Sequence, residues 1–155
     1  MTDQPLVLQV IIGSTRPGRK GPAVAAWVMK QATAHGKFVV ELVDLADFKL
    51  PILDEVAHPR LAQYEHEHTK RWSASVKRAD AYVFVLPEYD FSMPASLLNA
   101  LQCTYQEWTY KPAAFVSYGG ESGGLRSVQM TRQVLSTFKV PAMLEVVSIH
   151  QVAKH

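Results

Sequence analysis

The chain has 155 residues, of which 48% are hydrophobic and 19% charged, and its formal net charge is +2. This is the composition of a compact globular protein, and we expect residues 1–155 to form a single domain. The small net charge argues against nucleic-acid binding. Because the sequence has neither a bilayer-length apolar run nor a signal-type segment, we expect no membrane partner and a cytoplasmic location.

Apolar runs alternate with helical patterns along the chain. Residues 6–12, 38–42, 81–86, 113–117 and 143–149 are rich in Val and Phe, which predicts strands buried on both faces. The intervening patterns predict helices over residues 22–34, 61–79, 94–106 and 125–138. The first helix should end at His35-Gly36, and the third should begin near Pro94 with Ser92 as its N-cap.

This alternation predicts a doubly wound α/β fold with five parallel strands. Ligands of such sheets bind beyond the carboxyl ends of the strands, where the winding direction reverses. The loops after the first, third and fourth strands should therefore meet at one site.

The loop after the first strand carries glycines, hydroxyls and cations directly ahead of a helix. Its sequence is Gly13-Ser14-Thr15-Arg16-Pro17-Gly18-Arg19-Lys20-Gly21. Backbone N–H groups at a helix N-terminus bind anions, and the cations add to that preference. The loop matches neither the nucleotide P-loop nor the dinucleotide fingerprint, so we predict a site for a terminal monophosphate. The alternative is that Gly and Pro form only a connection.

Two further loops are suited to a flat ring. After the third strand comes Pro87-Glu88-Tyr89-Asp90-Phe91-Ser92-Met93-Pro94, in which prolines stiffen the backbone and aromatic side chains can shield a ring. After the fourth comes Ser117-Tyr118-Gly119-Gly120-Glu121-Ser122-Gly123-Gly124, whose glycines permit close backbone approach. The alternatives are aromatic residues that cap the core and a mobile turn. Together the three loops describe a site for flavin mononucleotide (FMN).

Two other features could suggest a metal site or a reactive cysteine, and we expect neither. His66 and His68 lie two residues apart in a predicted helix and should point in different directions, so we expect no shared metal ion. The single cysteine, Cys103, excludes an intramolecular disulfide, and we expect it to be a buried structural thiol.

The three motifs in this order resemble the NADPH-dependent FMN reductase family of flavodoxin-like proteins, which includes quinone, azo-dye and chromate reductases. The resemblance rests on residues 13–19, 87–94 and 117–124, with Leu97, Asn99 and Ala100, and it covers essentially the whole chain. It implies a flavodoxin-like three-layer sandwich whose five parallel strands have the order 2-1-3-4-5, forming one FMN-binding domain.

The resemblance also implies which residues bind FMN. It assigns the phosphate to Ser14, Arg16, Arg19 and neighbouring backbone, including Thr15, Gly18, Lys20 and Gly21. It assigns the isoalloxazine ring and ribityl chain to Pro87, Glu88, Tyr89, Asp90 and Phe91, and the pyrimidine side to Ser117, Tyr118, Gly119, Gly120 and Gly123. This chain departs from the family at Asp90, where the family usually has Asn, and at Leu98 and Gln102, where it often has Lys and Asp.

The implied function is a two-electron oxidoreductase with no catalytic side chain and no metal, because the flavin carries the chemistry. NADPH or NADH would reduce FMN, which would then reduce a quinone, an azo compound, free flavin or a metal oxyanion. The resemblance also implies a homodimer or homotetramer.

Two alternatives are a flavodoxin-type electron carrier and a non-catalytic FMN-binding redox sensor. Flavodoxins are usually strongly acidic with a Thr/Ser-rich phosphate loop, whereas this chain has a net charge of +2 and Arg16 in the loop. These features favour the enzyme over the electron carrier.

Overall fold

The structure, a computed structural model, describes residues 4–155. Its strands are β1 (Leu6–Ile12), β2 (Phe38–Asp44), β3 (Ala81–Pro87), β4 (Ala113–Tyr118) and β5 (Ala142–Ile149). Its α-helices are α1 (Gly21–His35), α2 (Leu45–Phe48), α3 (Glu67–Arg78), α4 (Ala95–Gln102) and α5 (Leu125–Thr137). Short 3-10 helices cover Pro59–Leu61, Gln106–Trp108 and Val152–Lys154. Within residues 4–155 no helix is long and apolar enough to cross a membrane.

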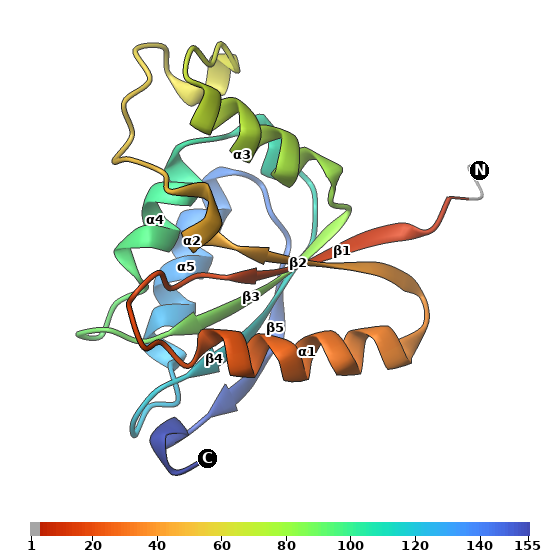
Figure 1. The fold of residues 1–155 in the computed structure, drawn as a ribbon, viewed down its shortest axis with the longest axis vertical. Helices are drawn as coiled ribbons and strands as arrows, with labels where there is room; N and C mark the ends of the chain where they lie inside the picture. The colour runs from red at the N-terminus through yellow and green to blue at the C-terminus, as the bar shows by residue number, and fades with distance from the viewer. Residues whose placement is uncertain (1–3) are drawn as a thin grey trace.

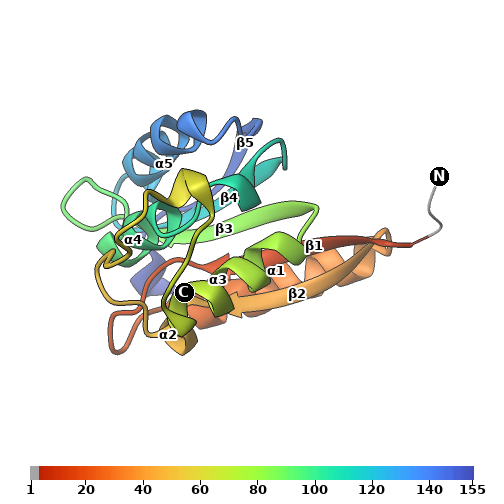
Figure 2. The ribbon, with the colours of Figure 1, turned by 90° about the horizontal axis from the view of Figure 1, so that it is seen from above.

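The strands form one parallel sheet with the order β2-β1-β3-β4-β5. This is the flavodoxin-like order, so the predicted fold class is confirmed. Figures 1 and 2 show α1 on one face of the sheet and α3, α4 and α5 on the other. The carboxyl ends of β1, β3 and β4 therefore lie at one edge, as the strand pattern predicts.

The two faces have separate cores. On the face covered by α3, α4 and α5, Trp72, Leu101 and Leu135 of these helices pack against Phe84 and Phe115 of the sheet. Trp72 Nε1 also donates a hydrogen bond to the Ala100 carbonyl at 2.8 Å. On the other face Val24, Ala25 and Val28 of α1 pack against residues of β1, β3 and β4. These two cores fix the strand ends from which the site loops leave.

Coverage of the α1 face is incomplete. Within residues 4–155, α1 is the only α-helix on this face, and it leaves an apolar groove of about 330 Å³ lined in part by Trp27, Val83 and Val116. On β5, Met143 is 50% and Val147 45% exposed. The expectation of strands buried on both faces is therefore wrong for β5. It is also wrong for β2, the other edge strand, where Val39 is 46% and Leu42 52% exposed.

The predicted helix over residues 61–79 is wrong in its first six residues, because α3 begins at Glu67. Tyr64 is held outside the helix by its hydroxyl, which donates to the buried Glu107 carboxylate at 3.0 Å. The Glu55 carboxylate accepts hydrogen bonds from the backbone N–H groups of Glu65 and His66, at 2.8 and 3.1 Å. These long-range contacts replace the helical hydrogen bonds that local pattern predicts.

Other boundary predictions have mixed outcomes. Gly36 caps α1 with a φ of 75°, as predicted, and Pro94 precedes α4. The helix predicted over residues 94–106 is too long, because α4 ends at Gln102 and Gln106 begins a short 3-10 helix. Ser92 is not the N-cap of α4, since Pro94 occupies that position. The Ser92 hydroxyl instead donates to the Met93 carbonyl at 3.0 Å.

Replacing Leu101 tests whether this core supports the fold. Leu101 has no exposed surface, so Leu101→Ala should lower the free energy of unfolding by about 2–5 kcal/mol through lost burial and a residual cavity. Leu144, 85% exposed, is the matched control. Leu144→Ala should change the free energy of unfolding by less than about 0.5 kcal/mol. Urea unfolding measures both, and equal effects would show that Leu101 is not a core residue in solution.

Candidate functional site

The three loops leave the sheet at the same edge (Figure 1), and the first residue of each is hydrogen-bonded to a neighbouring strand. Gly13 donates its backbone N–H to the Val85 carbonyl of β3 at 2.9 Å, which prolongs the β1–β3 pairing into the first loop. Glu88 donates to the Tyr118 carbonyl at 3.3 Å, and Gly119 donates to the Ile149 carbonyl at 3.2 Å. The residues predicted to form the site therefore start from adjacent positions on one edge.

The N-terminus of α1 is open to an anion. Its N-cap residue, Lys20, has helical backbone angles and makes no side-chain capping hydrogen bond, and its first turn contains no acidic residue. Gly18 has a φ of 71°, and the Arg19 N–H closes the turn onto the Arg16 carbonyl at 3.2 Å. Pro22 has no N–H, and the Ala23 N–H donates to the Lys20 carbonyl at 3.1 Å. The Gly21 N–H and the positive end of the helix dipole are therefore left to face the loop.

The three cations of this loop have different environments. The Arg19 guanidinium forms an ion pair with Asp44 at the end of β2, and both side chains are largely buried. The Arg16 guanidinium lies 5.8 Å from the centre of the Tyr89 ring, and the side chains of Arg16 and Lys20 are exposed. Arg19 therefore shapes the loop, while Arg16 and Lys20 are available to a ligand.

A hydrogen bond between hydroxyls links the first loop to the second. Ser14 is fully buried, and its Oγ lies 2.9 Å from the Tyr89 hydroxyl. The same Oγ accepts the Arg16 backbone N–H at 3.3 Å. Ser14 thus holds Tyr89 beside the first loop, close to the start of α1.

A buried hydroxyl without a partner lies beneath the same turn. Tyr118 is 3% exposed, and its hydroxyl has no hydrogen-bond partner among residues 4–155. That hydroxyl lies 3.0 Å from the position that a Cβ on Gly21 would occupy. A buried hydroxyl prefers to be hydrogen-bonded, and an anion at the start of α1 would supply an acceptor. These residues fit a phosphate group.

The second loop contains a strained two-residue turn. Tyr89 and Ser92 exchange backbone hydrogen bonds of 3.0 and 2.8 Å, and the residues between them, Asp90 and Phe91, have φ values of 50° and 65°. Positive φ at both central positions is typical of a type I′ turn, which favours Asn and Gly. Asp tolerates this conformation better than Phe does. The turn presents Phe91, 70% exposed, at the mouth of the site.

Glu88 joins the second loop to the third. Its carboxylate accepts from Ser122 Oγ at 2.6 Å, from the Arg126 backbone N–H at 3.1 Å and from Arg126 Nε at 2.6 Å. Burial alone would raise the pKa of Glu88, but the hydrogen bonds from Ser122 and Arg126 and the Arg126 charge lower it. The Arg126 guanidinium also lies 3.7 Å from the centre of the Phe91 ring. Glu88 is therefore an anchor between loops, and Arg126 is a site residue that the sequence patterns did not reveal.

The glycines of the third loop serve mainly the loop itself. Gly123 and Gly124 have φ values of 58° and 88°, and a Cβ on Gly124 would lie 2.8 Å from Ser117 Cβ. The Ser117 hydroxyl is buried and donates to the Gly123 carbonyl at 2.8 Å. A Cβ on Gly120 would meet open space. Gly120 is therefore a position in this loop at which there is space for a ligand to lie close to the backbone.

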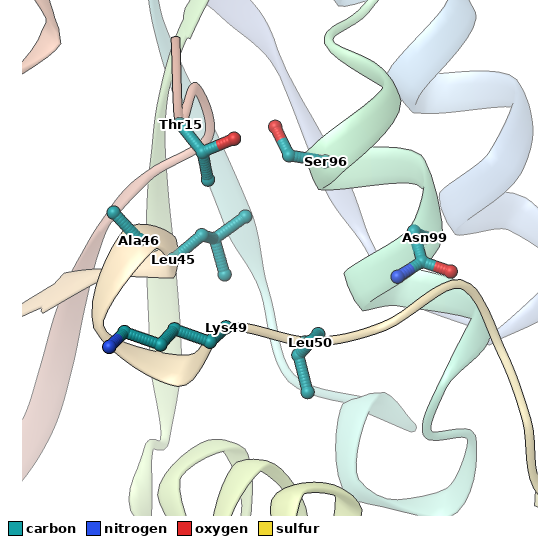
Figure 3. Close-up of a pocket in the computed structure, with 7 residues that line it drawn as sticks. All are labelled: Thr15, Leu45, Ala46, Lys49, Leu50, Ser96 and Asn99. Atoms are coloured by element: carbon teal, nitrogen blue, oxygen red, sulfur yellow. The ribbon is translucent and has the colours of Figure 1, made fainter. Parts of the chain in front are cut away.

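Thr15 faces a pocket on the α2 side of the first loop (Figure 3). The pocket has a volume of about 230 Å³ and is lined by Thr15, Leu45, Ala46, Lys49, Leu50, Ser96 and Asn99. The Thr15 and Ser96 hydroxyls point towards one another, and Ser96 Oγ donates to the Gly13 carbonyl at 2.7 Å. Sequence patterns missed α2, although Asp44 accepts the Ala46 N–H as an ordinary N-cap.

The histidine pair has a different geometry from the one predicted. His66 is the N-cap of α3 with extended backbone angles, so its ring stacks on His68 with centres 5.2 Å apart. His68 Nε2 lies 2.9 Å from Asp54 Oδ1. The expectation that these rings diverge is wrong, because it assumed that both residues are helical. Among residues 4–155 no group of three or more His, Cys, Asp or Glu side chains is arranged to hold a metal.

Cys103 lies at the C-terminal end of α4 and is buried, as predicted. Burial raises the pKa of its thiol to about 11. A thiol with this pKa is protonated near neutral pH and is a poor nucleophile.

Comparisons with known proteins give one family. A family model described as NADPH-dependent FMN reductase matches residues 7–154. An NAD(P)H-dependent FMN reductase of Schizosaccharomyces pombe is 44% identical over 117 residues, which cover 74% of this chain and 58% of that protein. A quinone reductase of Pseudomonas putida is 31% identical over 140 residues, which cover 86% of this chain and 72% of the relative.

The likeness extends to solved structures. FerB, a flavoenzyme NAD(P)H:(acceptor) oxidoreductase from Paracoccus denitrificans, superposes with a TM-score of 0.69 at 22% identity, covering 92% of this chain and 78% of FerB. At this identity the likeness bears on the fold alone. The chain spans only 58% of the S. pombe relative's length, so the match does not extend over that whole protein.

The Glu88 anchor predicts a pH-dependent contribution to stability. Because its pKa is lowered in the folded state, this contribution is complete above the ordinary value of 4.5 and is lost as the pH falls through the folded pKa. Glu88→Gln should lower the free energy of unfolding by about 1–2 kcal/mol at pH 7, since Arg126 is half exposed and its charge is screened.

Denaturant unfolding at several pH values measures this difference, which should shrink below pH 4.5. The control is Glu67→Gln, because Glu67 pairs with Lys70 on the exposed surface and should make no measurable difference. If the effect of Glu88→Gln on the free energy of unfolding did not change with pH, the charge of the Glu88 carboxylate would not be what stabilises the contact.

Proposed function

Because the chain belongs to the NADPH-dependent FMN reductase family, we propose that it is an FMN-containing oxidoreductase that uses NADPH or NADH to reduce a small-molecule acceptor. When bound, FMN supplies the chemistry, by accepting a hydride and delivering two electrons. The observation that carries the proposal is the start of α1, which has no side-chain cap and lies beside the partnerless Tyr118 hydroxyl, with Arg16 exposed in the loop that precedes it.

The roles of the chain's own residues follow from their positions. Arg16, Lys20 and the backbone of residues 14–21 bind the phosphate. Tyr89, Asp90 and Phe91 would border the ring and ribityl chain on one side, and Gly119, Gly120 and the backbone of Tyr118 would border the ring on the other. Glu88 and Arg126 hold these two loops together. This link would orient the ring between the loops, with one of its faces open to donor and acceptor.

A quinone is the acceptor that we propose first, because a quinone reductase is among the relatives with high coverage. An azo compound, free flavin and a metal oxyanion are alternatives that the same open ring face would admit. The proposal includes a homodimer or homotetramer in the cytoplasm.

The second candidate function is a flavodoxin-type electron carrier, and the third is a redox sensor. The parallel-sheet order and the phosphate loop suit all three. The net charge of +2 and the exposed Arg16 favour the enzyme, since an electron carrier that docks by charge is usually acidic.

The spectrum and turnover of the purified protein test the enzyme directly. We expect a bound chromophore that is released on denaturation and identified as FMN by mass. We also expect steady NAD(P)H oxidation with benzoquinone in the absence of an accessory reductase. Because donor and acceptor share one ring face, initial-rate plots should be parallel. Bound FMN without turnover would contradict the enzyme and support the carrier or the sensor.

Arg16→Ala should weaken FMN binding to the apoprotein about tenfold or more, through the loss of a charge-assisted hydrogen bond to the phosphate. Flavin fluorescence titration measures the dissociation constant. Lys30→Ala is the matched control, because Lys30 is an exposed cation later in α1 and its loss should leave the constant unchanged. Equal effects of the two variants would reduce the role of Arg16 to general electrostatic attraction.

A further inference from the structure

The Tyr118 hydroxyl occupies an unusual position beneath the phosphate loop. Tyr118 is the last residue of β4, and its side chain packs on the α1 face with Val10, Ile12 and Val24. The side chain therefore reaches across the sheet from the third loop to the first residue of α1. Its hydroxyl is buried without a hydrogen-bond partner among residues 4–155.

Gly21 makes room for this hydroxyl. A Cβ at position 21 would lie 3.0 Å from the Tyr118 oxygen and 2.8 Å from Ile12 Cγ2. Cβ atoms in a helix tilt towards its N-terminus, so the hydroxyl lies beside the end of α1 that faces the loop.

The surroundings leave this hydroxyl to act as a donor. Burial raises the pKa of Tyr118, with the nearby Tyr89 phenol adding to the increase and Arg19 opposing it, so the phenol keeps its proton near neutral pH. Arg19 is already paired with Asp44, and the Tyr89 hydroxyl is already hydrogen-bonded to Ser14. Neither Arg19 nor Tyr89 therefore accepts a hydrogen bond from the Tyr118 hydroxyl.

We propose that the Tyr118 hydroxyl donates a hydrogen bond to the phosphate of the flavin and thereby makes the site selective for FMN over riboflavin. This inference rests on the proposed function, since it assumes that a flavin occupies the site. It assigns to the phosphate end a residue that the sequence places in a ring-binding loop. The two ends of the ligand are then coupled through one strand, because residues 119 and 120 directly follow Tyr118.

The competing explanation is a buried water that satisfies the hydroxyl in the absence of ligand and stays when flavin binds. A water of this kind would make Tyr118 a packing residue. The two explanations differ in how removal of the oxygen affects phosphorylated and unphosphorylated flavins.

The experiment compares FMN and riboflavin binding to apoprotein of the full chain by fluorescence titration. Tyr118→Phe should weaken FMN binding about tenfold or more and leave riboflavin binding unchanged, because only FMN carries the acceptor. The melting temperature of the apoprotein should stay the same or rise, since an unpaired buried hydroxyl is removed without a change of shape. Tyr110→Phe is the control, because Tyr110 is 70% exposed and should change none of these values.

Gly21→Ala provides a second variant that keeps the phenol but crowds it. Its Cβ should displace the Tyr118 oxygen and also weaken FMN binding more than riboflavin binding. Equal losses for FMN and riboflavin in Tyr118→Phe, or no loss for either, would overturn the inference while leaving the proposed function intact. Failure of the unmodified apoprotein to bind FMN would overturn both.

Discussion

The first N–H groups of an α-helix have no carbonyl partner within the helix, and a protein must provide one for them or leave them to solvent or a ligand. In α1 the N-cap residue Lys20 makes no side-chain capping bond, Pro22 has no N–H, and the Ala23 N–H donates to the Lys20 carbonyl. The Gly21 N–H is therefore the group that is left for a ligand. The strand order places this helix end at the edge where β1, β3 and β4 finish. The rest of the candidate site is arranged around that unsatisfied end.

The surrounding interactions give the site its rigidity. Ser14 connects the first loop to Tyr89, Glu88 connects the second loop to Arg126 at the start of α5, and Ser117 closes the third loop. The strain of Asp90 and Phe91 at positive φ is tolerated within this framework, and such strain is often found in binding sites. A cofactor that carries its own chemistry needs orientation more than catalytic side chains, and these bonds supply it.

Much of this arrangement could be predicted from the sequence. Apolar runs and helical periodicity locate the five strands and the order of the loops, because parallel strands are continuous in apolar character. The pairing of Arg19 with Asp44 could not be predicted, because it depends on the β1–β2 register that sets Ile12 beside Asp44. The late start of α3 depends on Tyr64 and Glu107, which are 43 residues apart. Long-range contacts of this kind override local pattern.

The turn at Asp90 and Phe91 was also beyond prediction, because neither residue is the Asn or Gly that signals positive φ. The incomplete cover of β5 has a related cause. Its residues read as a buried strand, but no α-helix of residues 4–155 packs on the α1 side of it. Burial depends on what packs against a strand as well as on the strand's own composition.

The central claim is that FMN binds along the carboxyl edge of the sheet, with its phosphate at α1 and its ring between the second and third loops. The most direct measurement is a titration of isotope-labelled apoprotein with FMN, followed by assigned backbone amide shifts. The largest changes should fall in residues 13–21, 88–92 and 118–124, and riboflavin should spare the first of these segments. Saturable changes centred on other segments would contradict it.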